Sequence, residues 1–170
     1  TVPGIALAHE RFGKLPWQDL VEPAVKLATE GFPVDAPLAR SLNSWLKQAA
    51  AYDEVQRIFT KPDKSPWKQG DRLVQKDLAG TLRQLADRGP DAFYNGPIAD
   101  RLAEEMKLAG GLITKEDLAK YTATVRTPIH GTYRGHDIYA PPPPSSGGTA
   151  LVEMLNVLEN YALATQGRTS

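Results

Sequence analysis

The chain has 170 residues, and its 20 basic residues balance 20 acidic ones, without a single cysteine. Balanced charge gives no net field to draw in nucleic acid or an anionic membrane, and the lack of cysteine excludes disulfides, thiolate metal sites and a cysteine nucleophile. The length predicts one domain with a sizeable core, and no apolar stretch approaches the roughly 20 residues that a membrane-spanning helix needs.

The first third of the chain predicts three helices. Residues Ile5–Phe12 have a short helical pattern that Gly13 closes, and a second apolar face begins near Pro16 and ends at Gly31. Asp35 is placed to cap a third helix, whose apolar residues recur at spacings of three and four.

A long loop is predicted between Asp53 and Gln75, with at most one helical turn at 55–59, because prolines, a glycine and many charges interrupt any periodicity. Lys61, Lys64 and Lys68 lie in this loop, but acids and prolines separate them. No aromatic residues alternate with them as single-strand binding requires, so we expect a solvated loop.

Periodicity returns in the middle of the chain. A helix over Leu78–Ala86 stops at Gly89, and another restarts at Pro97, which predicts two antiparallel helices. Thr114, followed three residues later by Asp117, resembles a capping box, so a further short helix is expected there.

The strands are predicted late in the chain. Ala123 and Val125 alternate with polar residues, and the β-favouring residues of 132–139 flank a turn at Gly135 and His136. The sequence therefore predicts a β-hairpin, and in all about six helices and two or three strands.

A proline run, Pro141–Pro144, then predicts an extended connector before the last helix. Ser145 or Ser146 is placed to cap that helix, since neither lies in a Gly-x-Ser-x-Gly elbow or a Ser-x-x-Lys pair. The adjacent Gly147 and Gly148 either allow close packing of the backbone or present N–H groups to an anion.

Other candidate side chains favour plain roles. His9, His130 and His136 are too far apart in sequence for a helical zinc pair, so no metal site is predicted. The acidic pairs Glu104–Glu105 and Glu116–Asp117 are adjacent on helices and point in different directions, so we expect them to be solvated.

Thr1 would be a nucleophile only if its own amine served as the base. It leads directly through Val2, Pro3 and Gly4 into a helical pattern, so we expect a segment cut from a longer polypeptide. The fold class expected is α+β, predominantly helical with a short β-hairpin. Residues 1–121 form its helical region, and 122–170 contribute strands, connector and helix.

Six sequence blocks, in order, resemble the γ-glutamyltranspeptidase family. They are TVPG with IALAHERFGKLPW, EPAVKLA with the following GF, DRLVQKDLAGTLRQLADRGPDAFYNG, GGLITKEDLAKY, RTPIHGTYRG, and PPPPSSGG with LNVLEN. The resemblance implies a parent enzyme with the αββα fold of N-terminal-nucleophile hydrolases, cleaved by itself into a large and a small subunit. It also implies that an exposed threonine attacks the γ-glutamyl amide of glutathione or a related compound, and that water or an amine then takes the acyl group, without a cofactor.

The same resemblance places this chain in the C-terminal part of the large subunit. The nucleophile of a Thr-Thr-His-type segment, the arginine for the substrate carboxylate, the oxyanion glycines and the serine pair of the pocket are all expected elsewhere in the precursor. No catalytic, substrate-binding or metal residue is therefore expected here, and the connector serines and glycines receive no such role.

The partners implied are the rest of the large subunit and the small subunit, in a periplasmic or extracellular location. Two alternatives remain: a non-catalytic helical binding module on the same scaffold, and a relative of cephalosporin acylases or poly-γ-glutamate depolymerases. The isolated chain is further expected to expose an apolar edge between Ala123 and Ala140.

Overall fold

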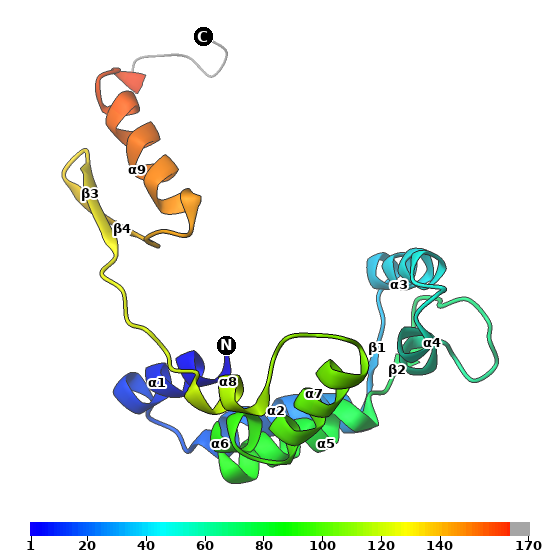
Figure 1. Cartoon of the computed structure of the whole chain (residues 1–170). Coiled ribbons are helices and arrows are strands. Elements are labelled where there is room, and N and C mark those ends of the chain that lie inside the picture. The colour runs from blue at the N-terminus through cyan, green and yellow to red at the C-terminus, as the bar shows by residue number, and fades with distance from the viewer. Residues whose placement is uncertain (164–170) are drawn as a thin grey trace. The chain divides into compact units, whose positions relative to one another are not determined.

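The computed structural model describes residues 1–163, and it divides the chain into two compact units, Thr1–Ala123 and Thr124–Ser170 (Figure 1). Within the described residues, the first unit has one small antiparallel sheet among its helices and the second has one with a single helix beside it, so the chain is α+β and mostly helical, as predicted. No helix within the described residues is both long and apolar enough to cross a membrane.

The first unit contains eight of the helices found in residues 1–163, together with a two-stranded ladder. Its elements are α1 (Val2–Phe12), α2 (Trp17–Glu30), β1 (Phe32–Pro33), α3 (Ala36–Gln48), α4 (Asp53–Phe59), β2 (Arg72–Leu73), α5 (Lys76–Arg88), α6 (Asp91–Tyr94), α7 (Pro97–Leu108) and α8 (Lys115–Lys120).

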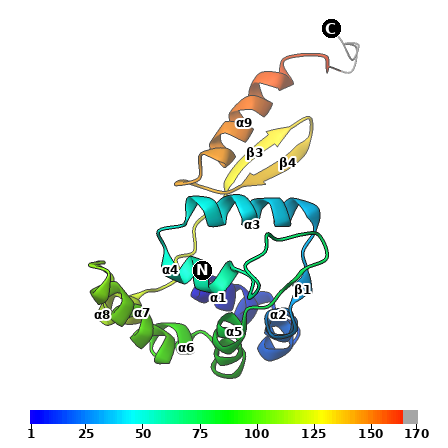
Figure 2. The same cartoon turned by 90° about the vertical axis from the view of Figure 1, so that its right-hand side faces the viewer.

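Helices α2 and α5 form the main helical pair and run antiparallel. The Trp17 indole donates to the Leu85 carbonyl at 2.8 Å, while at the other end the Gln75 N–H donates to the Ala28 carbonyl at 2.9 Å. The expected pairing of α5 with the helix at Pro97 is wrong, since α7 packs on α6 and α8 instead (Figure 2). The short α6, which was not predicted, occupies the link between them.

The ladder of β1 and β2 was also missed, because two residues per strand leave no alternation to read. Phe32 pairs with Leu73 and Pro33 with Arg72. Gly31 makes the tight approach possible: its φ is 73°, and an added Cβ would lie 2.5 Å from the Val74 side chain. The ladder closes a core formed by buried Val34, Ala39, Leu42, Trp67 and Leu73.

Several helix ends are set as the sequence predicts. The Asp35 carboxylate accepts the Leu38 N–H at 2.7 Å, and Thr114 with Asp117 forms a reciprocal capping box. The helical turn expected at 55–59 is the end of α4.

The second unit is a hairpin with one helix on it. Strands β3 (Ile129–Tyr133) and β4 (His136–Ala140) pair antiparallel, and α9 (Ser146–Glu159) packs on both strands. The turn lies at Arg134 and Gly135, with φ of 49° and 80°, so the expected turn is shifted by one residue. Residues 123–128 form no strand, contrary to expectation.

Candidate functional site

The connector before α9 does not run fully extended as expected. The chain turns at Pro143 and Pro144, and the Ser145 N–H donates to the Pro142 carbonyl at 3.3 Å. Ser145 occupies the N-cap position of α9, but its side chain makes no capping hydrogen bond, so the predicted cap is wrong in this respect.

The two glycines of the connector have different surroundings. An added Cβ on Gly148 would lie 2.1 Å from the Pro141 carbonyl oxygen, whereas on Gly147 it would meet only the Ser145 hydroxyl at 3.6 Å. Gly148 is buried against the end of β4, which favours the close-packing interpretation over anion binding.

The serine hydroxyls and the histidines do not form a nucleophile and base. Within residues 1–163, neither Ser145 nor Ser146 has a side-chain hydrogen bond to a histidine or a carboxylate. His9 contacts the Leu15 carbonyl at 2.8 Å, and His130 contacts the Asp137 carboxylate at 2.7 Å. No group of three His, Cys, Asp or Glu side chains suited to a metal ion occurs in the described part of the chain.

Thr1 and one residue of the acidic pairs, Asp117, make local contacts. The Thr1 carbonyl accepts the Ile5 N–H at 3.1 Å as α1 begins. Glu104, Glu105 and Glu116 are exposed. Asp117 is not simply solvated: the Thr114 N–H donates to its carboxylate, and this bond lowers the pKa of Asp117.

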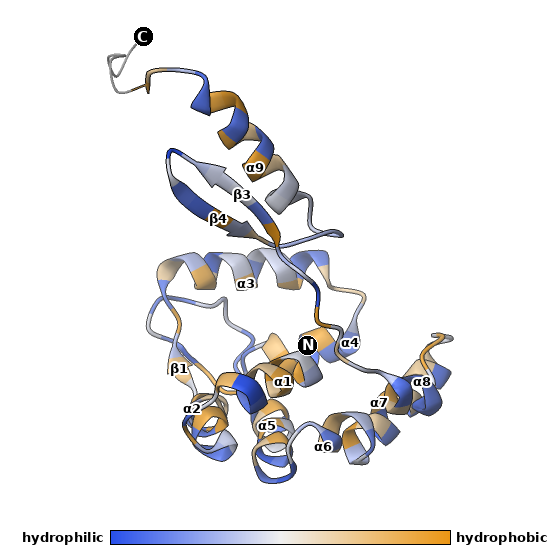
Figure 3. Ribbon diagram, turned by 90° about the vertical axis from the view of Figure 1, so that its left-hand side faces the viewer, coloured by the Kyte–Doolittle hydropathy of each residue, from blue (hydrophilic) through white to orange (hydrophobic). Residues whose placement is uncertain are grey.

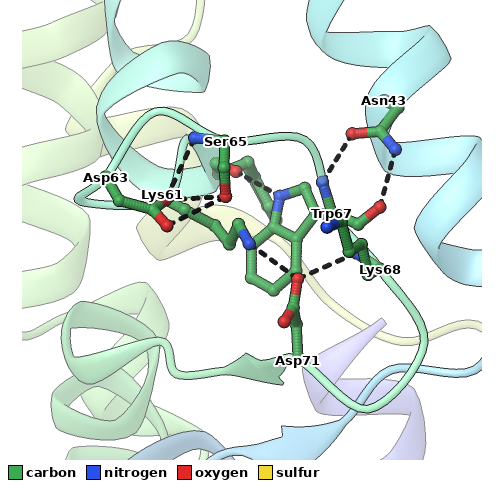
Figure 4. A network of polar contacts seen from close by, with 8 residues as sticks. Asn43, Lys61, Asp63, Ser65, Trp67, Lys68 and Asp71 are labelled. Atoms are coloured by element: carbon green, nitrogen blue, oxygen red, sulfur yellow. Dashed lines mark hydrogen bonds and ion pairs between the residues drawn. The ribbon is translucent and has the colours of Figure 1, made fainter.

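An ordered polar network, which we call the Trp67 loop, spans residues 60–71 and was not predicted (Figure 4). The Asn43 side chain accepts the Trp67 N–H at 2.8 Å and donates to the Trp67 carbonyl at 2.9 Å. The Trp67 indole N–H donates to the Phe59 carbonyl at 2.7 Å, and only 6% of the residue is exposed. A tryptophan amid charged residues was the one signal in the sequence that this loop is anchored.

The loop is closed by an ion pair. Lys61 Nζ lies 2.7 Å from the Asp71 carboxylate, and the lysine side chain is only 15% exposed, so the expected solvated lysine is wrong at this position. The hydrogen bond from Lys61, followed by that from the Lys68 N–H, lowers the pKa of Asp71. Asp63 likewise has a lowered pKa, because Ser65 donates to it from its backbone and its hydroxyl.

The whole chain, residues 1–170, matches the family model for γ-glutamyltranspeptidase. It is 46% identical over 167 residues to the glutathione hydrolase proenzyme of Escherichia coli (strain K12), covering 98% of this chain and 29% of that protein. It is 41% identical over 160 residues to the acylase ACY 1 proenzyme of Pseudomonas sp. (strain SE83), covering 94% of this chain and 28% of that protein.

Among solved structures, the chain is similar to Helicobacter pylori γ-glutamyltranspeptidase, with a TM-score of 0.94 and 38% identity over 99% of this chain and 48% of that one. The chain spans less than a third of the length of the two proenzymes, the glutathione hydrolase and the acylase. The matching sequence model, relatives and structure agree over the helical unit and the hairpin unit alike. This chain belongs to the γ-glutamyltranspeptidase family.

Proposed function

We propose that the chain is a scaffold segment of the large subunit of an enzyme that transfers γ-glutamyl groups. The observation that carries the proposal is the match of all 170 residues to the family, at 46% identity to a glutathione hydrolase proenzyme. The coverage of only 29% of that relative supports a segment rather than a whole catalytic unit.

In the proposed reaction, a threonine hydroxyl outside this chain attacks the carbonyl carbon of the γ-glutamyl amide. The amide nitrogen leaves with a proton, and the γ-glutamyl group remains on the threonine as an ester. Water or an amine then attacks the ester and releases the threonine hydroxyl, with the free amine of the same threonine moving the protons. No cofactor takes part.

We assign no catalytic, substrate-binding or metal residue to this chain. The described contacts support that proposal, since the connector serines lack a base and Gly148 is engaged in packing. Residues 1–121 would form the helical region of the subunit. Residues 122–170 would add strands, connector and helix to the central αββα sandwich.

The exposed side chains of α9 support a place inside a larger assembly. The helix covers the hairpin with one face, yet Leu151, Met154, Val157 and Leu158 remain 38–56% exposed on it. Figure 3 shows hydrophobic and hydrophilic residues alternating along the ribbon of α9. Apolar contact area of this kind is typical of an interface, here with the rest of the large subunit and the small subunit.

An assay with γ-glutamyl-p-nitroanilide tests the proposal. The isolated chain should release no more p-nitroaniline than a blank, and the precursor that contains it should release it steadily after self-cleavage. Turnover by the isolated chain would refute the scaffold role. A precursor that is neither cleaved nor active would refute the proposed enzyme activity and favour a binding module.

A second candidate is acylase activity, because the chain is also 41% identical to an acylase proenzyme. Parallel assays of the precursor with a γ-glutamyl amide and with a cephalosporin side-chain amide distinguish the two. A higher kcat/KM on the cephalosporin would replace the first proposal. For either activity we propose export to the periplasm or beyond, which fractionation of cells that make the precursor would check.

A further inference from the structure

A pocket of about 390 Å³ lies beside the Trp67 loop, between the loop and helices α3 and α4. Three lysines, Lys47, Lys61 and Lys64, line it, and no aspartate or glutamate does. Its remaining lining is neutral, with the polar Thr60 and Ser65 among it. The size is within the range of small-molecule sites, and the charge is of one sign.

Part of the pocket wall, at Thr60 and Lys61, is held in place by contacts within the protein. Lys61 is held by Asp71 at 2.7 Å and lies over the Trp67 ring, with Nζ 5.9 Å from its centroid (Figure 4). Thr60 is tied to Gln56 at 3.3 Å. A preformed wall lowers the conformational cost of binding.

Lys64 is held in an unusual backbone conformation. Its φ is 56°, a region that glycine and asparagine adopt more easily than lysine. The Lys64 N–H donates to the Lys61 carbonyl at 2.9 Å, and the Asp63 carboxylate accepts the Ser65 N–H at 3.0 Å, so both sides of the residue are anchored. The sequence therefore places a cation where a neutral residue would be more stable.

Two of the positive charges are uncompensated. Asp71 pairs with Lys61, but within residues 1–163 the side chains of Lys47 and Lys64 have no ion pair and no hydrogen bond. Lys47 lies in the last turn of α3, close to this pocket wall. A ligand with two negative groups would neutralise both lysines.

We propose that this pocket binds a small oxyanion with two or more carboxylate or phosphate groups. Ammonium groups bind either group as point charges, so the two lysines without a partner, Lys47 and Lys64, are the groups that would hold the ligand. The anion site is proposed independently of the γ-glutamyl reaction, so a negative result in the binding experiment would leave the proposed function unchanged.

An NMR titration of the ¹⁵N-labelled protein with citrate, and separately with pyrophosphate, tests the site at constant ionic strength held with NaCl. We expect saturable shifts of amides in residues 60–66. Lys47→Gln and Lys64→Asn should each weaken binding about five- to tenfold. Tighter binding of citrate would assign the site to carboxylates, and tighter binding of pyrophosphate would assign it to phosphates.

Lys64→Asn also separates binding from folding, because asparagine accepts the left-handed conformation. Its melting temperature should equal or exceed that of the wild type while the affinity falls. Lys14→Asn, at an exposed loop position, removes the same charge elsewhere and should leave affinity unchanged. The proposal is overturned if neither anion gives saturable shifts, if the pocket variants bind like wild type, or if Lys14→Asn weakens binding equally.

Discussion

At the scale of single residues, Asn43 is central to the packing inside the first unit, and Gly148 is central to the packing inside the second. Asn43 satisfies both backbone groups of the buried Trp67, a contact between positions 24 residues apart. Gly148 lets the first turn of α9 approach the Pro141 carbonyl more closely than any Cβ allows. Both roles depend on distances that the sequence pattern does not contain.

Replacing Asn43 by alanine should reduce the free energy of unfolding by about 1–3 kcal/mol, because the Trp67 N–H and carbonyl would be left without partners. Urea denaturation, monitored by tryptophan fluorescence, measures this change in the free energy of unfolding. Asn95→Ala is the control, since Asn95 is exposed and its side chain makes one 3.3 Å bond. Equal effects of the two variants would contradict the anchoring role.

Gly148→Ala should destabilise the second unit by about 1–3 kcal/mol through its clash with the Pro141 carbonyl. Gly147→Ala should be neutral or stabilise α9 by about 0.5–1 kcal/mol, because the space around it is open. Amide hydrogen exchange in β3 and β4 reports this unit separately, since all tryptophans lie in the first unit. Similar exchange in both variants would refute the difference between the two glycines.

At the scale of elements, helices were predicted best and their partners worst. The capping signals at Asp35 and Thr114 act within one turn, so the sequence places these helix ends correctly. The α2–α5 pairing and the β1–β2 ladder depend on segments about 40 to 70 residues apart, which local periodicity does not describe. The Trp67 loop is ordered for the same reason, by contacts to α3 and α4.

This loop should make stability depend on pH through Asp71. Its pKa is lowered in the folded state, so the folded protein binds the proton less readily than the unfolded one. The stabilisation is complete above the unfolded pKa, near 4, and is lost as the pH falls through the folded pKa.

Asp71→Asn keeps an acceptor for the Lys68 N–H but removes the charge. The variant should therefore be less stable than wild type at pH 7, and the difference should shrink toward pH 2.5. Urea denaturation midpoints of both proteins between pH 7 and pH 2.5 measure this difference in stability. A difference that stays constant with pH would show that the ion pair does not contribute.

At the scale of the whole chain, apolar surface remains on the second unit. The expected apolar edge of the strands is only partly present: Tyr139 is exposed, but His130 and Asp137 share that face of the hairpin. Four exposed large apolar residues of this unit lie on α9 instead, among them Met154, 56% exposed, and Val157, 54% exposed.

The isolated chain should therefore bind a hydrophobic dye such as ANS, and Met154→Lys with Val157→Lys should reduce the fluorescence without lowering the helix content. The loss should be partial, because apolar side chains of the first unit such as Leu112, 91% exposed, are unchanged. Circular dichroism monitors the helix. Lys substitutions at Gln18 and Ser41, which are neutral residues on exposed helix positions, add the same two charges and serve as the control. A strictly monomeric chain that binds no dye would refute the exposed interface.

The sequence by itself determined the family, the α+β class, most of the helices and the hairpin, because these depend on local spacing, caps and ordered blocks of residues. Only the tertiary structure decided which helices pair, that Gly148 serves close packing, and that Lys61 is largely covered and pairs with Asp71 while Lys47 and Lys64 have no ion pair. These outcomes depend on contacts between distant segments, and a contact of that kind exists only once the chain has folded.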